Sequence, residues 1–206
     1  AVGKEAAEAV KMARVIPGQI ASLILPSDTA WNEGGVVHDK LRAPLPSQFD
    51  QTYLKKAVEM LDGPESLLLL GGTALSEGNL KMAGRIASKT GCNLLSEWSN
   101  ARLERGAGRV SINRVPYPID VALKVLEPYK RIVLIGARAP IGFFAYPGKP
   151  AILTRKGADI LTLADVGSDL TVAMTALLDA TGSAQSAPAN LANAKLPERP
   201  NGAINL

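Results

Sequence analysis

The sequence predicts an α/β fold, an open parallel β-sheet of about six strands with helices on both faces. Short, continuous apolar runs alternate along the chain with segments in which apolar residues recur every three or four positions. Continuous runs are typical of strands that are covered on both faces, and the longer spacing is typical of amphipathic helices. Because strands and helices alternate, we expect parallel strands joined by right-handed crossovers, a Rossmann-like arrangement.

Apolar runs that we expect to be strands lie, in chain order, at Ile20–Leu25, Leu67–Leu70, Asn93–Ser96, Ile132–Ile135 and Ile160–Leu163. A further segment, Ala151–Thr154, is either another short strand or a loop. Helices are expected at residues 1–15, Phe49–Leu61, Leu75–Lys89, Ile119–Leu126 and Ser168–Leu178. Gly91 is placed to cap the end of one helix, and Ser168 or Asp169 to cap the start of the last.

Composition excludes several classes of protein. With 47% hydrophobic residues the chain can build a core, so disorder of the whole chain is excluded. The net charge of +4 is spread out, without a run of five Lys or Arg residues, which argues against nucleic acid as a partner. No window approaches about 18 uninterrupted apolar residues, so we expect no membrane partner. One cysteine excludes a disulfide, and a free thiol suits a reducing cytoplasm.

Glycine follows two of the expected strands. The residues of these two corners are Gly71, Gly72, Gly136, Ala137 and Arg138. In an open parallel sheet, ligands bind at the carboxyl ends of the strands, where glycine lets the backbone approach a phosphate and Arg138 would supply a counter-charge. We therefore take these residues as candidate cofactor-binding residues. The alternative is a pair of tight turns, because neither corner completes a G-x-G-x-x-G or a P-loop motif.

Two further segments leave alternatives open. Residues 102–109 hold three arginines and two glycines, which would suit either a clamp for a diphosphate or a solvated loop that contacts a neighbouring domain. The aromatic segment Ile141–Pro150 would cover a ligand, bind a partner or pack on its own domain.

The isolated reactive side chains form no recognisable catalytic set. The only histidine, His38, lies in an expected linker, and the only cysteine, Cys92, is expected to be a small buried residue. Helix capping explains Asp165 and Asp169 better than acid/base chemistry does. We therefore expect neither catalytic residues nor a metal site in this chain.

Four short motifs, in order, carry a family resemblance. They are LPSDTAW at residues 25–31, LLGGTAL at 69–75, IGARAP at 135–140 and AYPGKP at 145–150. This set resembles thiamine-diphosphate-dependent enzymes of the acetolactate synthase type, whose central domain is Rossmann-like, of the DHS-like NAD/FAD-binding type. The resemblance implies a remnant of the pyrimidine-binding domain at residues 1–31, a linker at 32–48, the central domain at 49–180, and a linker toward the diphosphate-binding domain at 181–206.

The resemblance also implies what this chain lacks. The family's activating glutamate lies early in the first domain, and its diphosphate and magnesium motif, GDG with a downstream Asn, lies in the third. Neither segment has a match here. Thiamine diphosphate and magnesium would therefore bind in the full-length parent. Some family members bind FAD across the strand ends of the central domain, which leaves FAD or ADP open for this chain.

Three hypotheses for function follow. The leading one is the central scaffold portion of a carboligase or 2-oxo-acid decarboxylase, inactive alone, with the flanking domains of the parent as partners and a homo-oligomer as the assembly. The alternatives are a stand-alone module that binds FAD, ADP or NAD, and a structural interaction domain without a ligand. Without its sheet neighbours, Ile20–Leu25 is expected to pack on the flank of the main sheet, pair with a second copy or stay disordered.

Overall fold

The computed structural model describes residues 2–194, 196–199 and 201–202. Its elements are α1 Val2–Ala13, α2 Ser27–Trp31, the 3-10 turn η1 Gln51–Tyr53, α3 Leu54–Met60, β1 Ser66–Leu70, the 3-10 turn η2 Gly72–Leu75, α4 Glu77–Thr90, β2 Asn93–Ser96, β3 Asn113–Arg114, α5 Ile119–Leu126, β4 Arg131–Ile135, β5 Asp159–Ala164 and α6 Leu170–Ala180. Within these residues, the structure has no helix with the length and apolar character needed to cross a membrane.

A parallel sheet of five strands, in the order β3-β2-β1-β4-β5, forms the centre of the fold. β1 lies in the middle, where Leu68 aligns with Leu94 of β2 on one side and with Val133 of β4 on the other. The pairing of β4 with β5 shifts register between Leu134 and Ile135. The α/β class and the parallel pairing are confirmed, with one strand fewer than expected.

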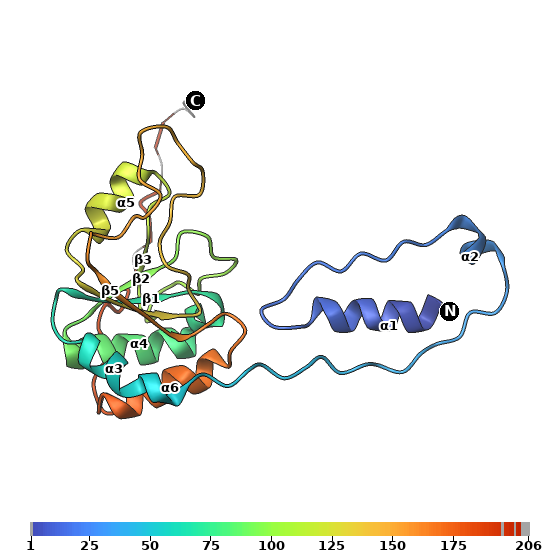
Figure 1. The fold of residues 1–206 in the computed structure, drawn as a ribbon, viewed down its shortest axis with the longest axis horizontal. Coiled ribbons are helices and arrows are strands. Elements are labelled where there is room, and N and C mark those ends of the chain that lie inside the picture. Colours follow the sequence, from blue (N-terminus) through green and yellow to red (C-terminus); the bar gives the residue numbers. More distant parts are fainter. Residues whose placement is uncertain (1, 195, 200, 203–206) are drawn as a thin grey trace.

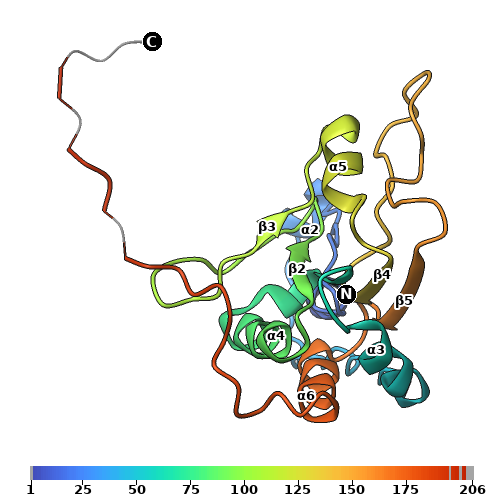
Figure 2. The same ribbon diagram turned by 90° about the vertical axis from the view of Figure 1, so that its left-hand side faces the viewer.

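Alternate residues of the central strand face two separate hydrophobic layers. Leu68 and Leu70 pack in the layer that includes α3, α4 and α6, whereas Leu67 and Leu69 pack in the layer that includes α5. Figure 2 shows α3, α4 and α6 on one side of the strands and α5 on the other. All five residues of β1 are buried, which explains why its apolar run is continuous.

Helix ends follow the expected capping chemistry at two places. Gly91 ends α4 in the left-handed conformation, with φ 78°, where a residue without Cβ is favoured. Asp169 begins α6, because its carboxylate accepts hydrogen bonds from the amides of Thr171 and Val172. These contacts confirm Gly91 as the cap of α4 and show that Asp169, rather than Ser168, caps α6.

The prediction of a strand at Ile20–Leu25 is wrong. This segment pairs with no other segment in the described part of the chain, and Ile20 is 96% exposed. It does not pack on the flank of the sheet either, since Ile24 is 87% exposed. Hydrophobicity alone does not make a strand, because a strand also needs a neighbour for its backbone hydrogen bonds.

Two smaller differences concern loops. Ala151–Thr154 is a loop, one of its two expected alternatives, and it contributes only the isolated bridge of Ile152 with Ile141. β3 was not predicted, because its two residues are exposed and polar and lack an apolar run. It exists through pairing with Leu95 and Ser96 of β2.

The N-terminal arm, residues 2–46, is set apart from the sheet, as Figure 1 shows. α1 has no buried residue, and Trp31 and Val37 are 85% and 97% exposed. The arm joins the body at Ser47, which donates its N–H to the Gly167 carbonyl and accepts from the Asp169 amide. The arm therefore carries apolar side chains that the body does not cover.

The segment after α6 packs against the body through residue 192. The Ala189 amide donates to the carbonyl of Gly84 in α4, and the Ala192 amide donates to the Arg109 carbonyl. A Cβ on Gly84 would lie 2.8 Å from Val110 and 3.1 Å from Pro188, so glycine permits this packing. Residues 195, 200 and 203–206 of the expected linker lie outside the described residues.

Candidate functional site

The candidate site lies at the carboxyl ends of β1 and β4, where the strand order reverses. The chain runs from β1 to β2 and β3 on one side and then returns to β4 and β5 on the other, so this boundary is the topological switch point. The two glycine corners are joined here, since the Gly71 amide donates to the Ile135 carbonyl at 3.0 Å. The structure therefore brings Gly71 and Gly136 together at the position where ligands bind in such sheets.

Protein atoms fill the space beside both glycines. A Cβ on Gly71 would lie 2.2 Å from the carbonyl oxygen of Gly136 and 2.6 Å from a carboxylate oxygen of Glu97. A Cβ on Gly136 would lie 2.4 Å from Leu170 and 2.5 Å from the Gly71 carbonyl oxygen, and Gly136 has φ +64°. The close approach of the two strand ends thus accounts for both glycines without a ligand.

The other three corner residues lie at different depths. Gly72 is exposed, begins η2 and has φ +52°. Ala137 is buried in the layer with α5. Arg138 is exposed beside Glu97. Of the five candidate residues, Arg138 alone carries a charge that would attract an anion.

Glu97 is a residue of this site that sequence reasoning missed. It directly follows β2, and its amide donates to the Leu70 carbonyl at 2.9 Å. Burial raises the pKa of its carboxyl, while the backbone amide and the positive charge of Arg138 oppose that rise. An acidic residue at the end of the second strand of a Rossmann-like unit is the signal that would have identified it.

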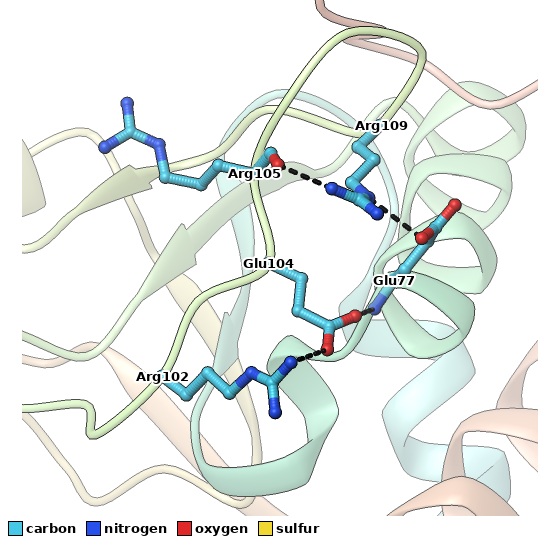
Figure 3. A network of polar contacts seen from close by, with 5 residues as sticks. All are labelled: Glu77, Arg102, Glu104, Arg105 and Arg109. Carbon is cyan, nitrogen blue, oxygen red and sulfur yellow. Dashed lines mark hydrogen bonds and ion pairs between the residues drawn. The ribbon is translucent and has the colours of Figure 1, made fainter.

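The arginine-rich loop, residues 102–109, binds to the start of α4 (Figure 3). The Glu77 amide donates to Glu104 Oε2 at 2.6 Å, and Arg102 Nη2 lies 3.0 Å from Glu104 Oε1. Arg109 Nε donates to Glu77 Oε2 at 2.8 Å, and its Nη1 donates to the Arg105 carbonyl. Two of the three arginines are thus paired with carboxylates of their own chain, which favours a structural loop over a diphosphate clamp.

An aromatic ladder stands on loops that follow β2, β3 and β4. In order of contact it consists of Tyr117, Trp98, Phe143, Phe144 and Tyr146, whose successive ring centroids lie 4.6 to 5.9 Å apart. Phe143 and Phe144 are more than half exposed. Tyr117 and Tyr146 line a groove of about 430 Å³, which is also lined by Lys149 and Asp120, an ion pair. Four members of the ladder, Tyr117, Phe143, Phe144 and Tyr146, are thus large exposed apolar side chains that lie together.

The remaining candidates form no catalytic set in the described residues. His38 is exposed, and its Nδ1 lies within hydrogen-bond distance of the neighbouring Asp39 carbonyl. Cys92 is buried, and burial raises the pKa of its thiol to about 11, which leaves it a poor nucleophile. Asp169 caps α6, and Asp165 accepts hydrogen bonds from the Gly167 amide and the Ser168 hydroxyl.

The residues around the candidate site fit neither a metal ion nor the phosphate of a nucleotide, the groups that the cofactors of the resembled family would bring. Residues described by the structure include no group of three or more His, Cys, Asp or Glu side chains that could hold a metal ion. A nucleotide phosphate would need the glycine corners and the first amides of α4. Carboxylates of Glu97 and Glu104 already lie at these two positions.

Comparison with known proteins identifies a relative of this chain. The chain is 35% identical over 202 residues to "Putative acetolactate synthase large subunit IlvX" of Mycobacterium tuberculosis (strain ATCC 25618 / H37Rv). The alignment covers 98% of this chain and 38% of that relative. This chain therefore spans well under half the length of the relative that it matches. No protein-family model matches the chain.

Solved structures share its fold. The thiamine diphosphate-dependent 4-hydroxybenzoylformate decarboxylase of Rhodococcus jostii RHA1 superposes with a TM-score of 0.57 at 14% identity, over 98% of this chain and 40% of that one. The benzoylformate decarboxylase of Polynucleobacter necessarius also gives 0.57, at 17% identity, over 83% of this chain and 34% of that one. At these identities the likeness shows the fold alone.

Proposed function

Because this chain is homologous to part of an acetolactate synthase large-subunit-like protein, we propose that it is the central scaffold portion of a thiamine-diphosphate-dependent carboligase or 2-oxo-acid decarboxylase. The observation that carries the proposal is the pattern of coverage. The alignment uses 98% of this chain but only 38% of the relative. The activity of the parent enzyme would therefore depend on polypeptide that this chain does not include.

The structure supports a scaffold role for this portion. Its parallel sheet is covered on both faces, so the body has a complete core of its own. The N-terminal arm and the aromatic ladder, by contrast, expose apolar side chains such as Ile20, Val37 and Phe143. Groups of exposed apolar side chains are typical of surfaces that contact other polypeptide. We assign these two surfaces to the flanking domains of the parent.

In the parent, thiamine diphosphate would supply the chemistry that cleaves a 2-oxo acid, with magnesium holding its diphosphate. This chain holds neither the activating glutamate nor the GDG motif of the family. Its own residues would position the neighbouring domains and exclude water from the surfaces that they cover. A homo-oligomeric assembly and a cytoplasmic location belong to the same proposal.

The first test is calorimetric titration of the full chain with thiamine diphosphate and Mg²⁺. We expect no saturable heat, because the ligands of the cofactor lie in other domains. Tight, magnesium-dependent binding would contradict the proposal. A second test is sequencing of the transcript that encodes residues 1–206. The proposal expects the reading frame to encode the activating glutamate upstream and the GDG motif downstream.

A further inference from the structure

Two carboxylates lie where a Rossmann-like domain would receive the phosphates of a nucleotide. We infer that the carboxylates of Glu104 and Glu97 occupy the positions at the switch point that nucleotide phosphates would need. This chain therefore binds neither ADP nor FAD there. The inference goes beyond the proposed scaffold role, since a scaffold domain with an open crevice could still bind a nucleotide. It rests on three features, namely the start of α4, the glycine corners and the charge around them.

The start of α4 already has an anion bound to it. In dinucleotide-binding folds, the helix that follows the first strand offers its free amides to the phosphates. Here the residue before the helix, Ser76, makes no side-chain cap, and the Glu77 amide donates to Glu104 at 2.6 Å. The side chain of Glu104 is only 26% exposed, so its carboxylate is held in place of a solvent anion.

Backbone contacts, more than charge pairs, hold Glu104 there. The Glu104 amide donates to the Leu75 carbonyl at 3.2 Å, which fixes its backbone beside the turn before α4. Arg102 contributes little to this arrangement, because it is 82% exposed and an exposed ion pair is weak. The other ion pair of the loop, between Arg109 and Glu77, anchors the far side of the loop to the same helix.

The glycine corners leave no room for a phosphate between the strands. The carbonyl oxygens of Gly71 and Gly136 occupy the space beside each other's Cα, and Leu170 covers Gly136. Glu97 covers the remaining side of Gly71. The hydrogen bond from the Gly71 amide to the Ile135 carbonyl holds the ends of β1 and β4 together in this arrangement.

The charges near the two strand ends are already paired with one another. Glu77 and Glu104 lie at the start of α4 and Glu97 lies beside Gly71, and Arg102 and Arg109 are bound to two of these carboxylates. Arg138 directly follows one of the glycine corners, and its positive charge acts on the carboxyl of Glu97. The three carboxylates are thus matched by three arginines, so a diphosphate would meet no excess of positive charge at close range.

The first experiment is calorimetric titration of the full chain with ADP and with FAD, up to about 1 mM and without Mg²⁺ or thiamine diphosphate. We expect no saturable heat. Saturable binding of either nucleotide would overturn the inference. That result would leave the scaffold proposal intact, because the scaffold proposal is tested with thiamine diphosphate and Mg²⁺ instead.

The second experiment compares thermal unfolding of Glu104→Ala, Glu104→Gln and the control Glu59→Ala, an exposed glutamate on α3. Loss of the cap is expected to lower the Tm of Glu104→Ala by about 2 to 4 °C, while Glu104→Gln retains an acceptor oxygen and loses less. Phosphate is expected to raise the Tm of Glu104→Ala above its value in chloride of equal ionic strength. The Tm of the unsubstituted chain is expected to be the same in both salts. If Glu104→Ala matches Glu59→Ala in both salts, Glu104 does not occupy an anion position and the inference fails.

Discussion

The carbonyl oxygen of Gly136 lies only 2.2 Å from the point where a Cβ on Gly71 would be placed, and the Gly71 carbonyl lies 2.5 Å from the corresponding point on Gly136. Each glycine therefore makes room for the backbone of the other. This reciprocal contact joins the ends of the two central strands and explains both glycines without reference to a ligand.

Gly136→Ala is expected to destabilise the fold strongly. The new methyl group would meet Leu170 and the Gly71 backbone, and Gly136 also has φ +64°. Overpacking and left-handed strain together predict a loss of about 3 kcal/mol in the free energy of unfolding, measured by urea denaturation. Gly157→Ala is the matched control, because Gly157 has φ +79° but nothing within 4 Å. An equal loss in both variants would show that strain alone matters and that the reciprocal contact does not.

Asp169→Ala is expected to weaken α6. Its carboxylate accepts from the amides of Thr171 and Val172. Removal of such a cap costs about 1 kcal/mol in the free energy of unfolding, which urea denaturation resolves. The control is Asp179→Ala near the end of the same helix, where a negative charge is unfavourable and its loss should be neutral or slightly stabilising. Equal destabilisation by the two variants would contradict the capping role.

Sequence reasoning succeeded where the signal is local. The run Leu67–Leu70 is long enough for a strand and ends at glycine, and the sheet indeed buries all of it. Gly91 and Asp169 act within a few residues of themselves, so their roles as caps were readable from adjacent positions. The meeting of the two glycine corners followed too, because parallel strands bring their carboxyl ends to one edge.

Sequence reasoning failed where the outcome depends on distant neighbours. Ile20–Leu25 has the composition of a strand but no partner among the described residues. β3 has a partner but no strand-like composition. Glu104 contacts Glu77, 27 positions away, and that contact exists only because the loop folds back on α4. No spacing rule places a carboxylate on a helix across such a distance.

Amide hydrogen exchange is expected to separate the arm from the body. Residues 20–25 donate no backbone hydrogen bonds to other described residues, so their amides should exchange close to the rate of an unfolded chain. Amides of Leu67–Leu70, in the central strand, should exchange only on global unfolding. Protection of residues 20–25 that disappears on dilution would show pairing with a second copy. Protection that persists in a monomer would contradict the exposed arm.

Cys92 is expected to make the fold sensitive to alkaline pH. Burial raises the pKa of its thiol from 9.0 to about 11, so the native state resists the thiolate while the unfolded chain does not. As the pH rises, the thiol therefore loses its proton in the unfolded state before it does so in the folded state. The stability that the buried neutral thiol provides is complete below pH 9.0 and is lost as the pH rises to about 11. Over that range the loss approaches about 2 to 3 kcal/mol.

Cys92→Ala isolates this effect, because tyrosine and lysine titrations are common to both proteins and cancel in the difference. We expect the free energy of unfolding of the unsubstituted chain to fall more steeply between pH 9 and 11 than that of the variant. Reaction of the thiol with a disulfide reagent near neutral pH should likewise be slow in the folded protein and fast in denaturant. Parallel pH profiles, together with rapid labelling of the folded chain, would mean that the thiol is open to solvent and that its pKa is not raised.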